Sequence, residues 1–208
     1  MTRMLATAAT LLTMAAPLSA HRLDEYLQAT LLSVEKDRLQ VSLRMIPGVA
    51  VAPAVIWSID TDRDGLLSEA ERQTYARRVL GDLSLRIDGR ALQPRLVSVT
   101  FPNTAEMEEG LGEIHIEFTA DLPRGSGDRK LVLENHHQSR ISAYLVNVLA
   151  HPDKDIRIAA QTRNRNQSLY ELDYVQTGGP PDLLSIEWLS GICASLLFAR
   201  LAFALLRT

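Results

Sequence analysis

Hydrophobic and polar residues alternate along much of the chain. Within residues 38–46, the apolar side chains of Leu39, Val41, Leu43 and Met45 are separated by polar or charged ones. A period of two places one face of a strand against a core and the other face in water. Comparable runs predict strands over residues 26–34, 38–46, 83–88, 91–101, 112–120, 129–136, 141–150, 155–160 and 168–175. About nine short strands at this spacing predict a mainly β fold, a β-sandwich-like domain.

One part of the chain departs from this alternation. Residues 52–59 predict a short helix, and residues 68–81 predict a second helix with Tyr75 and Val79 on one face at helical spacing. A loop joins the two. We therefore expect a helix–loop–helix insertion at residues 52–80 within the β domain.

The loop between these helices, residues 60–71, is called the acidic loop below. Its sequence, DTDRDGLLSEAE, has carboxylates at positions 1, 3, 5 and 12 and glycine at position 6. This spacing matches an EF-hand calcium loop, in which alternate side chains point at the ion and glycine permits the sharp turn. The predicted ligands are the carboxylates of Asp60, Asp62, Asp64 and Glu71, the carbonyl of Leu66, and Ser68 through a water.

We expect the cofactor to be Ca²⁺ in preference to Mg²⁺, because seven oxygens in a flexible loop suit the larger ion. Leu67 is the apolar residue expected to anchor the loop outside the site. A single loop of this kind favours a structural calcium site over a sensor. The alternative is an acidic turn that only contacts solvent.

Both ends of the chain carry membrane signals. Residues 1–20 combine a basic start, a short apolar run and small residues, which is the layout of a cleaved signal peptide. Residues 188–208 are apolar enough to cross a membrane despite Arg200, and residues 177–187 form a polar linker before them. We expect residues 21–176 to be an exported domain on the periplasmic face of the inner membrane, anchored by one helix with a cytoplasmic C-terminus. An amphipathic helix along the membrane is the alternative for the last segment.

Composition and charge argue against several function classes. A net charge of -3, without a dense run of Lys and Arg, disfavours a nucleic-acid partner. Cys193 is the single cysteine, so no intramolecular disulfide can form. The chain has no glycine-rich phosphate loop, nucleophile-elbow serine or zinc-protease helix pair. We therefore expect neither an enzyme nor a small-molecule substrate.

Taken together, these features resemble exported bacterial proteins that contain an EF-hand domain. The likeness is carried by HRLDEYLQATL, IDTDRDGLLSEAE, LSLRIDGRALQPRLVSVTFP, ISAYLVNVL and SLYELDYV, and covers most of residues 21–176. The beginning is also distantly similar to the exported N-terminal regions of nickel/cobalt permeases and hydrogenase/urease-accessory membrane proteins. The chain departs from those permeases in lacking their several membrane spans. The resemblance implies calcium binding at the acidic loop, and it argues against transport by this chain alone.

A second candidate function belongs to a different class. Cleavage of the signal peptide makes His21 the first residue, whose amine and imidazole can chelate nickel or copper. The alternative function is therefore a periplasmic accessory that handles such a metal for a membrane-protein partner, a permease. Possible further ligands are His115, His136, His137 and His151, which the sequence does not bring together. His136 and His137 point to opposite faces if extended, so we expect them in a surface loop and not on one ion.

Overall fold

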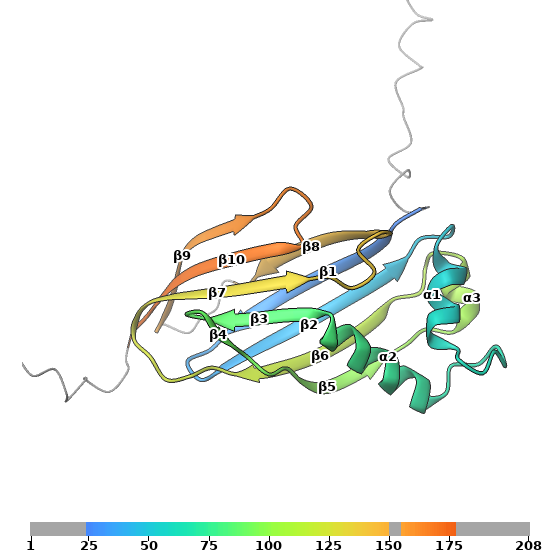
Figure 1. Ribbon diagram of the computed structural model, residues 1–208, viewed down its shortest axis with the longest axis horizontal. Coiled ribbons are helices and arrows are strands. Elements are labelled where there is room, and N and C mark those ends of the chain that lie inside the picture. The colour runs from blue at the N-terminus through green and yellow to red at the C-terminus, as the bar shows by residue number, and fades with distance from the viewer. Residues whose placement is uncertain (1–23, 150–154, 178–208) are drawn as a thin grey trace, which may run out of the picture.

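The computed structural model of the protein describes residues 24–149 and 155–177. These residues form ten strands in two five-stranded sheets that pack face to face (Figure 1). The prediction of a mainly β fold is confirmed. The predicted signal peptide at 1–20 and membrane segment at 188–208 lie outside the described residues. Within the described part of the chain, no helix has the length and apolar character needed to span a membrane.

The first sheet contains the two strands that begin the domain. Its members are β1 (Tyr26–Val34), β2 (Arg38–Pro47), β5 (Arg95–Thr100), β6 (Ile114–Asp121) and β8 (Ser142–Val148). They are arranged in the order β5-β6-β2-β1-β8. β1 and β8 run parallel, whereas the other neighbouring strands are antiparallel.

The second sheet is antiparallel throughout. Its members are β3 (Leu83–Ile87), β4 (Arg90–Ala91), β7 (Gly127–Asn135), β9 (Ile156–Arg163) and β10 (Leu169–Gln176), in the order β4-β3-β7-β10-β9. The two-residue strand β4 was not predicted. It pairs with β3 across Asp88 and Gly89, both of which have positive φ, as a tight hairpin turn requires.

The inward faces of the two sheets supply one hydrophobic core. The inward residues of β2 are Leu39, Val41, Leu43 and Met45, and all four are buried, as their alternation predicted. In β10, Tyr170, Leu172 and Tyr174 are buried in the same cluster. Burying a side chain of this size stabilises a fold by about 1.5–3 kcal/mol, so the sandwich rests on these rows.

Three helices gather at one end of the sandwich (Figure 1). They are α1 (Ala52–Ile59), α2 (Glu69–Gly81) and α3 (Thr104–Glu108). The first two connect β2 of one sheet to β3 of the other, which confirms the helix–loop–helix insertion. α1 buries Ala52, Val55, Ile56 and Ile59, whose spacing puts them on one helical face. The insertion is therefore fixed to the core on both sides of the acidic loop.

Candidate metal site

The acidic loop begins where α1 ends and runs into the first turn of α2. Asp60 follows the last residue of α1, and its backbone N–H still donates to Ile56. Ser68 caps the start of α2: its hydroxyl accepts from the N–H of Glu71, while the Glu71 carboxylate accepts from the N–H of Ser68. This reciprocal capping satisfies donors that a helix start leaves free. It also aims the Glu71 side chain back over the loop.

Backbone hydrogen bonds wind the loop tightly around its own carboxylates. Gly65 has a φ of 83°, and its N–H donates to Oδ2 of Asp60 at 3.0 Å. The N–H of Asp64 donates to Oδ1 of Asp62 at 3.2 Å, and the N–H of Leu66 donates to Oδ1 of Asp64 at 2.7 Å. The left-handed turn at Gly65 is one that a side chain would strain. This turn is what returns the chain toward Asp60.

Three carboxylates converge inside this loop. Asp60, Asp62 and Glu71 each offer one oxygen, and these oxygens all lie within 4.8 Å of one another. Asp60 is only 5% exposed and Glu71 only 8%, whereas Asp62 is exposed. Oδ1 of Asp60 is buried and has no hydrogen-bond partner. A buried carboxylate oxygen without a donor is costly, and a cation beside it would offset that cost.

Glu71 is held as an anion by four donors. Oε1 accepts from the N–H of Thr61 at 2.6 Å and its hydroxyl at 3.0 Å, and Oε2 accepts from the N–H of Ser68 at 3.0 Å and its hydroxyl at 2.8 Å. The Ser68 hydroxyl, followed by the N–H groups of Ser68 and Thr61, lowers the pKa of Glu71 to about 2. The carboxylate is therefore charged at any pH relevant to the folded protein.

The structure brings together part of the predicted ligand set. Asp64 lies outside the group of three, and its Oδ1 accepts from the N–H of Leu66 within the loop. The Leu66 side chain is 71% exposed at the loop surface. Leu67 is buried in the core, as predicted for the residue that anchors the loop. Among the described residues, no second group of three His, Cys, Asp or Glu side chains could hold a metal.

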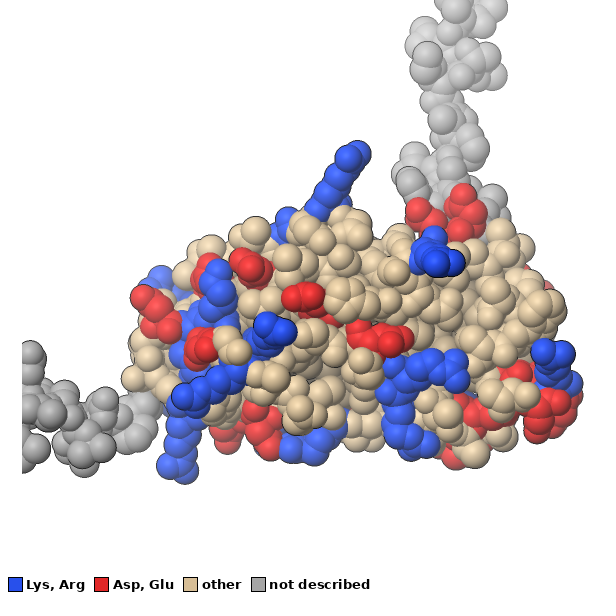
Figure 2. Space-filling view, viewed as in Figure 1, with Lys and Arg blue, Asp and Glu red and all other residues tan. Residues whose placement is uncertain are grey.

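Acidic and basic side chains are interspersed over the face shown in Figure 2. Both kinds also lie at the end that carries the helices, to which the acidic loop belongs (Figure 2).

The described histidines do not form a shared metal site. His115, on β6, lies 2.8 Å from the Ser42 hydroxyl. His136 lies 3.2 Å from Glu134, and the His136 side chain is 65% exposed. The prediction that His137 lies in a surface loop is wrong, because this residue is 2% exposed. His21, the candidate nickel or copper ligand, lies outside the described residues.

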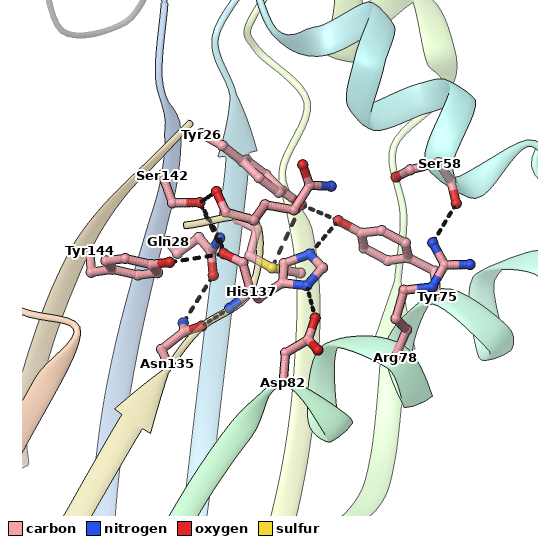
Figure 3. A network of polar contacts seen from close by, with 12 residues as sticks. Tyr26, Gln28, Ser58, Tyr75, Arg78, Asp82, Asn135, His137, Ser142 and Tyr144 are labelled. Atoms are coloured by element: carbon pink, nitrogen blue, oxygen red, sulfur yellow. Dashed lines mark hydrogen bonds and ion pairs between the residues drawn. The ribbon is translucent and has the colours of Figure 1, made fainter. Parts of the chain in front are cut away.

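His137 is the centre of a buried polar network that sequence reasoning missed (Figure 3). Its Nδ1 lies 2.8 Å from Oδ2 of Asp82, and its Nε2 lies 2.9 Å from the Tyr75 hydroxyl. The Tyr75 hydroxyl in turn lies 2.9 Å from the Tyr26 hydroxyl. We call Tyr26, Tyr75, Asp82 and His137 the clasp, because they join α2 to β1 and to the loop after β7.

The backbone of His137, like its ring, is held by hydrogen bonds. Its carbonyl accepts from Gln28 at 2.9 Å, from Ser142 at 3.1 Å and from Tyr144 at 2.9 Å, and its N–H donates to Asn135 at 2.9 Å (Figure 3). Burial lowers the pKa of His137, although the contact with Asp82 opposes this shift. The ring is therefore held in its neutral form, with Nδ1–H donating to Asp82.

The likeness to exported EF-hand proteins depends on the acidic loop and its flanking strands. In the loop, the structure gives Gly65 a positive φ, buries Leu67 and brings three carboxylates together. The family assignment itself stays a prediction. Comparison with family models, with curated proteins and with solved structures gives no match for this chain.

Proposed function

We propose that the protein is a calcium-binding structural module whose acidic loop holds a single Ca²⁺. Asp60, Asp62 and Glu71 would supply the first oxygens, with Asp64, the Leu66 carbonyl and a water on Ser68 completing the shell. Calcium takes six to eight oxygen ligands, and no other ligand type is required of this loop. The ion would neutralise carboxylates that otherwise repel one another.

The observation that carries this proposal is Oδ1 of Asp60. This oxygen is buried without a partner, and one oxygen each of Asp60, Asp62 and Glu71 lie within 4.8 Å of one another. A solvated acidic turn would leave its carboxylates exposed to water, whereas Asp60 is 5% exposed. The unsatisfied atom fits a hard cation that supplies the missing interaction.

A structural role fits the way the helices are held. α1 and α2 bury one face each against the sandwich, through residues such as Ile59 and Val79. A sensor needs helices that can separate and expose an apolar groove. Calcium here would instead tie the end of α1 to the start of α2. In the cell we expect the module on the periplasmic side of a membrane, held there by the predicted C-terminal segment.

Calorimetric titration of the full chain with calcium tests the proposal. The wild-type chain should bind one ion, and Asp60→Asn, which keeps the side-chain volume but removes the charge, should weaken binding at least a hundredfold. Glu108→Gln is the matched control, because it removes an exposed charge on α3 outside the loop. Equal affinities for wild type and Asp60→Asn, or no binding at millimolar calcium, would overturn the assignment.

A further inference from the structure

One helix carries both the candidate metal ligand and the clasp. Glu71 lies in the first turn of α2, Tyr75 follows four residues later, and Asp82 caps the end of the helix. Residues four apart lie on the same helical face, so Glu71 and Tyr75 are neighbours along one side of α2. Both are buried, at 8% and 1% exposed. A rigid rotation or shift of α2 therefore moves both groups together.

The clasp fixes α2 at two points against a single residue. Tyr75 and Asp82 contact the two ring nitrogens of His137 at 2.9 and 2.8 Å. The Tyr75 ring also packs edge-on against the His137 ring, with 5.4 Å between centroids. The backbone N–H of His136 donates to the carbonyl of Asp82 at 3.0 Å, which adds a third tie. The helix cannot turn about its axis without breaking these contacts.

The protonation state of His137 sets the direction of the hydrogen bonds in the clasp. With Nδ1–H directed at Asp82, the neutral ring accepts from Tyr75 at Nε2, and Tyr75 accepts from Tyr26. A second proton on His137 makes Nε2 a donor, so Tyr75 must donate to Tyr26, whose hydroxyl is left with the weak acceptor Sδ of Met45 at 3.6 Å.

The charged and titratable groups around the ring come from several elements. α2 and its C-cap residue contribute Tyr75, Arg78 and Asp82, β1 contributes Tyr26, and β8 contributes Tyr144, whose hydroxyl donates to the His137 carbonyl. Asp82 favours a second proton on the ring, whereas Arg78 and burial oppose it. The second proton therefore reverses the direction of these hydrogen bonds and places a positive charge on a ring that is 2% exposed.

We propose that the clasp positions α2, and with it the carboxylate of Glu71, so that calcium binding by the acidic loop and proton binding by His137 are coupled. This inference rests on the proposed calcium site. His137 is a positioning residue here, since it touches none of the candidate ligands. Because coupling between two sites is reciprocal, calcium must disfavour the second proton on His137 as much as that proton disfavours calcium.

Tyr75→Phe in the full chain is the sharpest test, because it removes one hydroxyl and keeps the ring. We expect calcium affinity at pH 7.5 to fall at least about fivefold, the lower end of usual coupling between sites. Tyr174→Phe is the matched control: its hydroxyl is buried without a partner in β10, away from α2, and its loss should leave affinity unchanged. Equal affinity in wild type and Tyr75→Phe would overturn the coupling while leaving the calcium site intact.

A pH profile separates positioning from a general loss of stability. Wild-type affinity should fall between pH 7.5 and 5.5, a range in which Glu71 stays charged because its pKa is about 2. His137→Gln cannot take up the proton, so its affinity should be flat across this range. NMR titration of the His137 ring should show a lower pKa in calcium than in chelator. An unchanged His137 titration in calcium would overturn the coupling, and failure of the wild type to bind calcium would overturn both proposals.

Discussion

The acidic loop and the clasp place polar groups on the same helix in opposite ways. In the clasp each ring nitrogen and hydroxyl is within hydrogen-bond distance of another protein group, so the network is complete without a ligand. In the loop, Oδ1 of Asp60 is buried without a partner, and three carboxylates converge. Burial of a satisfied network stabilises a unique packing, whereas an unsatisfied buried carboxylate costs stability that the proposed cation would restore.

The largest expected effect comes from breaking the clasp. His137→Ala removes the partner of Tyr75 and leaves a cavity under α2, so the free energy of unfolding should fall by about 3 kcal/mol. The loss should be larger in calcium than in chelator when measured by urea denaturation, because the variant also loses the positioning of α2 on which calcium affinity depends. His136→Ala is the control, because the His136 side chain is 65% exposed and its loss should change stability by less than about 0.5 kcal/mol. A loss below about 1 kcal/mol for His137→Ala would show that the clasp does not hold the fold.

Loss of the Asp60 charge in the acidic loop, in contrast, should change the free energy of unfolding only when calcium is present. At a hundred times the dissociation constant, bound calcium should stabilise the wild type by about 2.7 kcal/mol. Asp60→Asn should lose this gain and should match the wild type in chelator, since repulsion between carboxylates is relieved. Thermal unfolding with and without calcium measures both quantities. A variant that is destabilised equally in both conditions would mean that Asp60 acts in the fold alone.

Gly65 in the acidic loop and Gly81 at the end of α2 extend the comparison to the backbone. Both have open space where a Cβ would lie, but only Gly65 has a positive φ, of 83°. Gly65→Ala should therefore cost about 1 kcal/mol and weaken calcium binding, while Gly81→Ala at the end of α2 should stabilise by up to about 1 kcal/mol. Urea denaturation of the two variants checks the signs. Equal effects at both positions would contradict the turn geometry of the loop.

As the pH falls, the protein should lose the stabilising contribution of His137 before it loses that of Glu71. Burial lowers the pKa of His137, so the unfolded chain binds more protons than the folded one once the pH falls below about 6.5. The contribution to stability is therefore complete above that pH and declines below it. The Glu71 contribution is lost only between its ordinary value and about 2. A melting temperature that rises between pH 7 and 5.5, or an identical decline in His137→Gln, would contradict this order.

Much of the fold could be predicted from local patterns. The bounds of α1 and the start of α2 followed from helical spacing, and the inward row Tyr170, Leu172 and Tyr174 followed from alternation. The convergence of Asp60, Asp62 and Glu71 could be predicted because the spacing of carboxylates in the acidic loop is a local pattern. These features depend on residues that lie close together in the sequence.

Features that depend on distant contacts were missed. In the sequence, His137 looks like a second surface histidine next to His136. Its burial depends on Tyr75, which is 62 positions away. No local pattern carries that pairing. The short helix α3 is a different case, because Asn103 and Glu106 form a capping box that was present in the sequence. A helix of five residues is too short for a helical pattern of apolar residues to be recognised in the sequence.

The most direct test of the central claim is an X-ray structure of crystals grown in calcium, with anomalous data collected at long wavelength. We predict one anomalous peak in the acidic loop, about 2.3–2.6 Å from Oδ1 of Asp60 and from oxygens of Asp62 and Glu71. Asp64 and the Leu66 carbonyl should turn toward the same ion. A loop without a peak, in which Oδ1 of Asp60 instead accepts a hydrogen bond from a protein donor, would contradict the account.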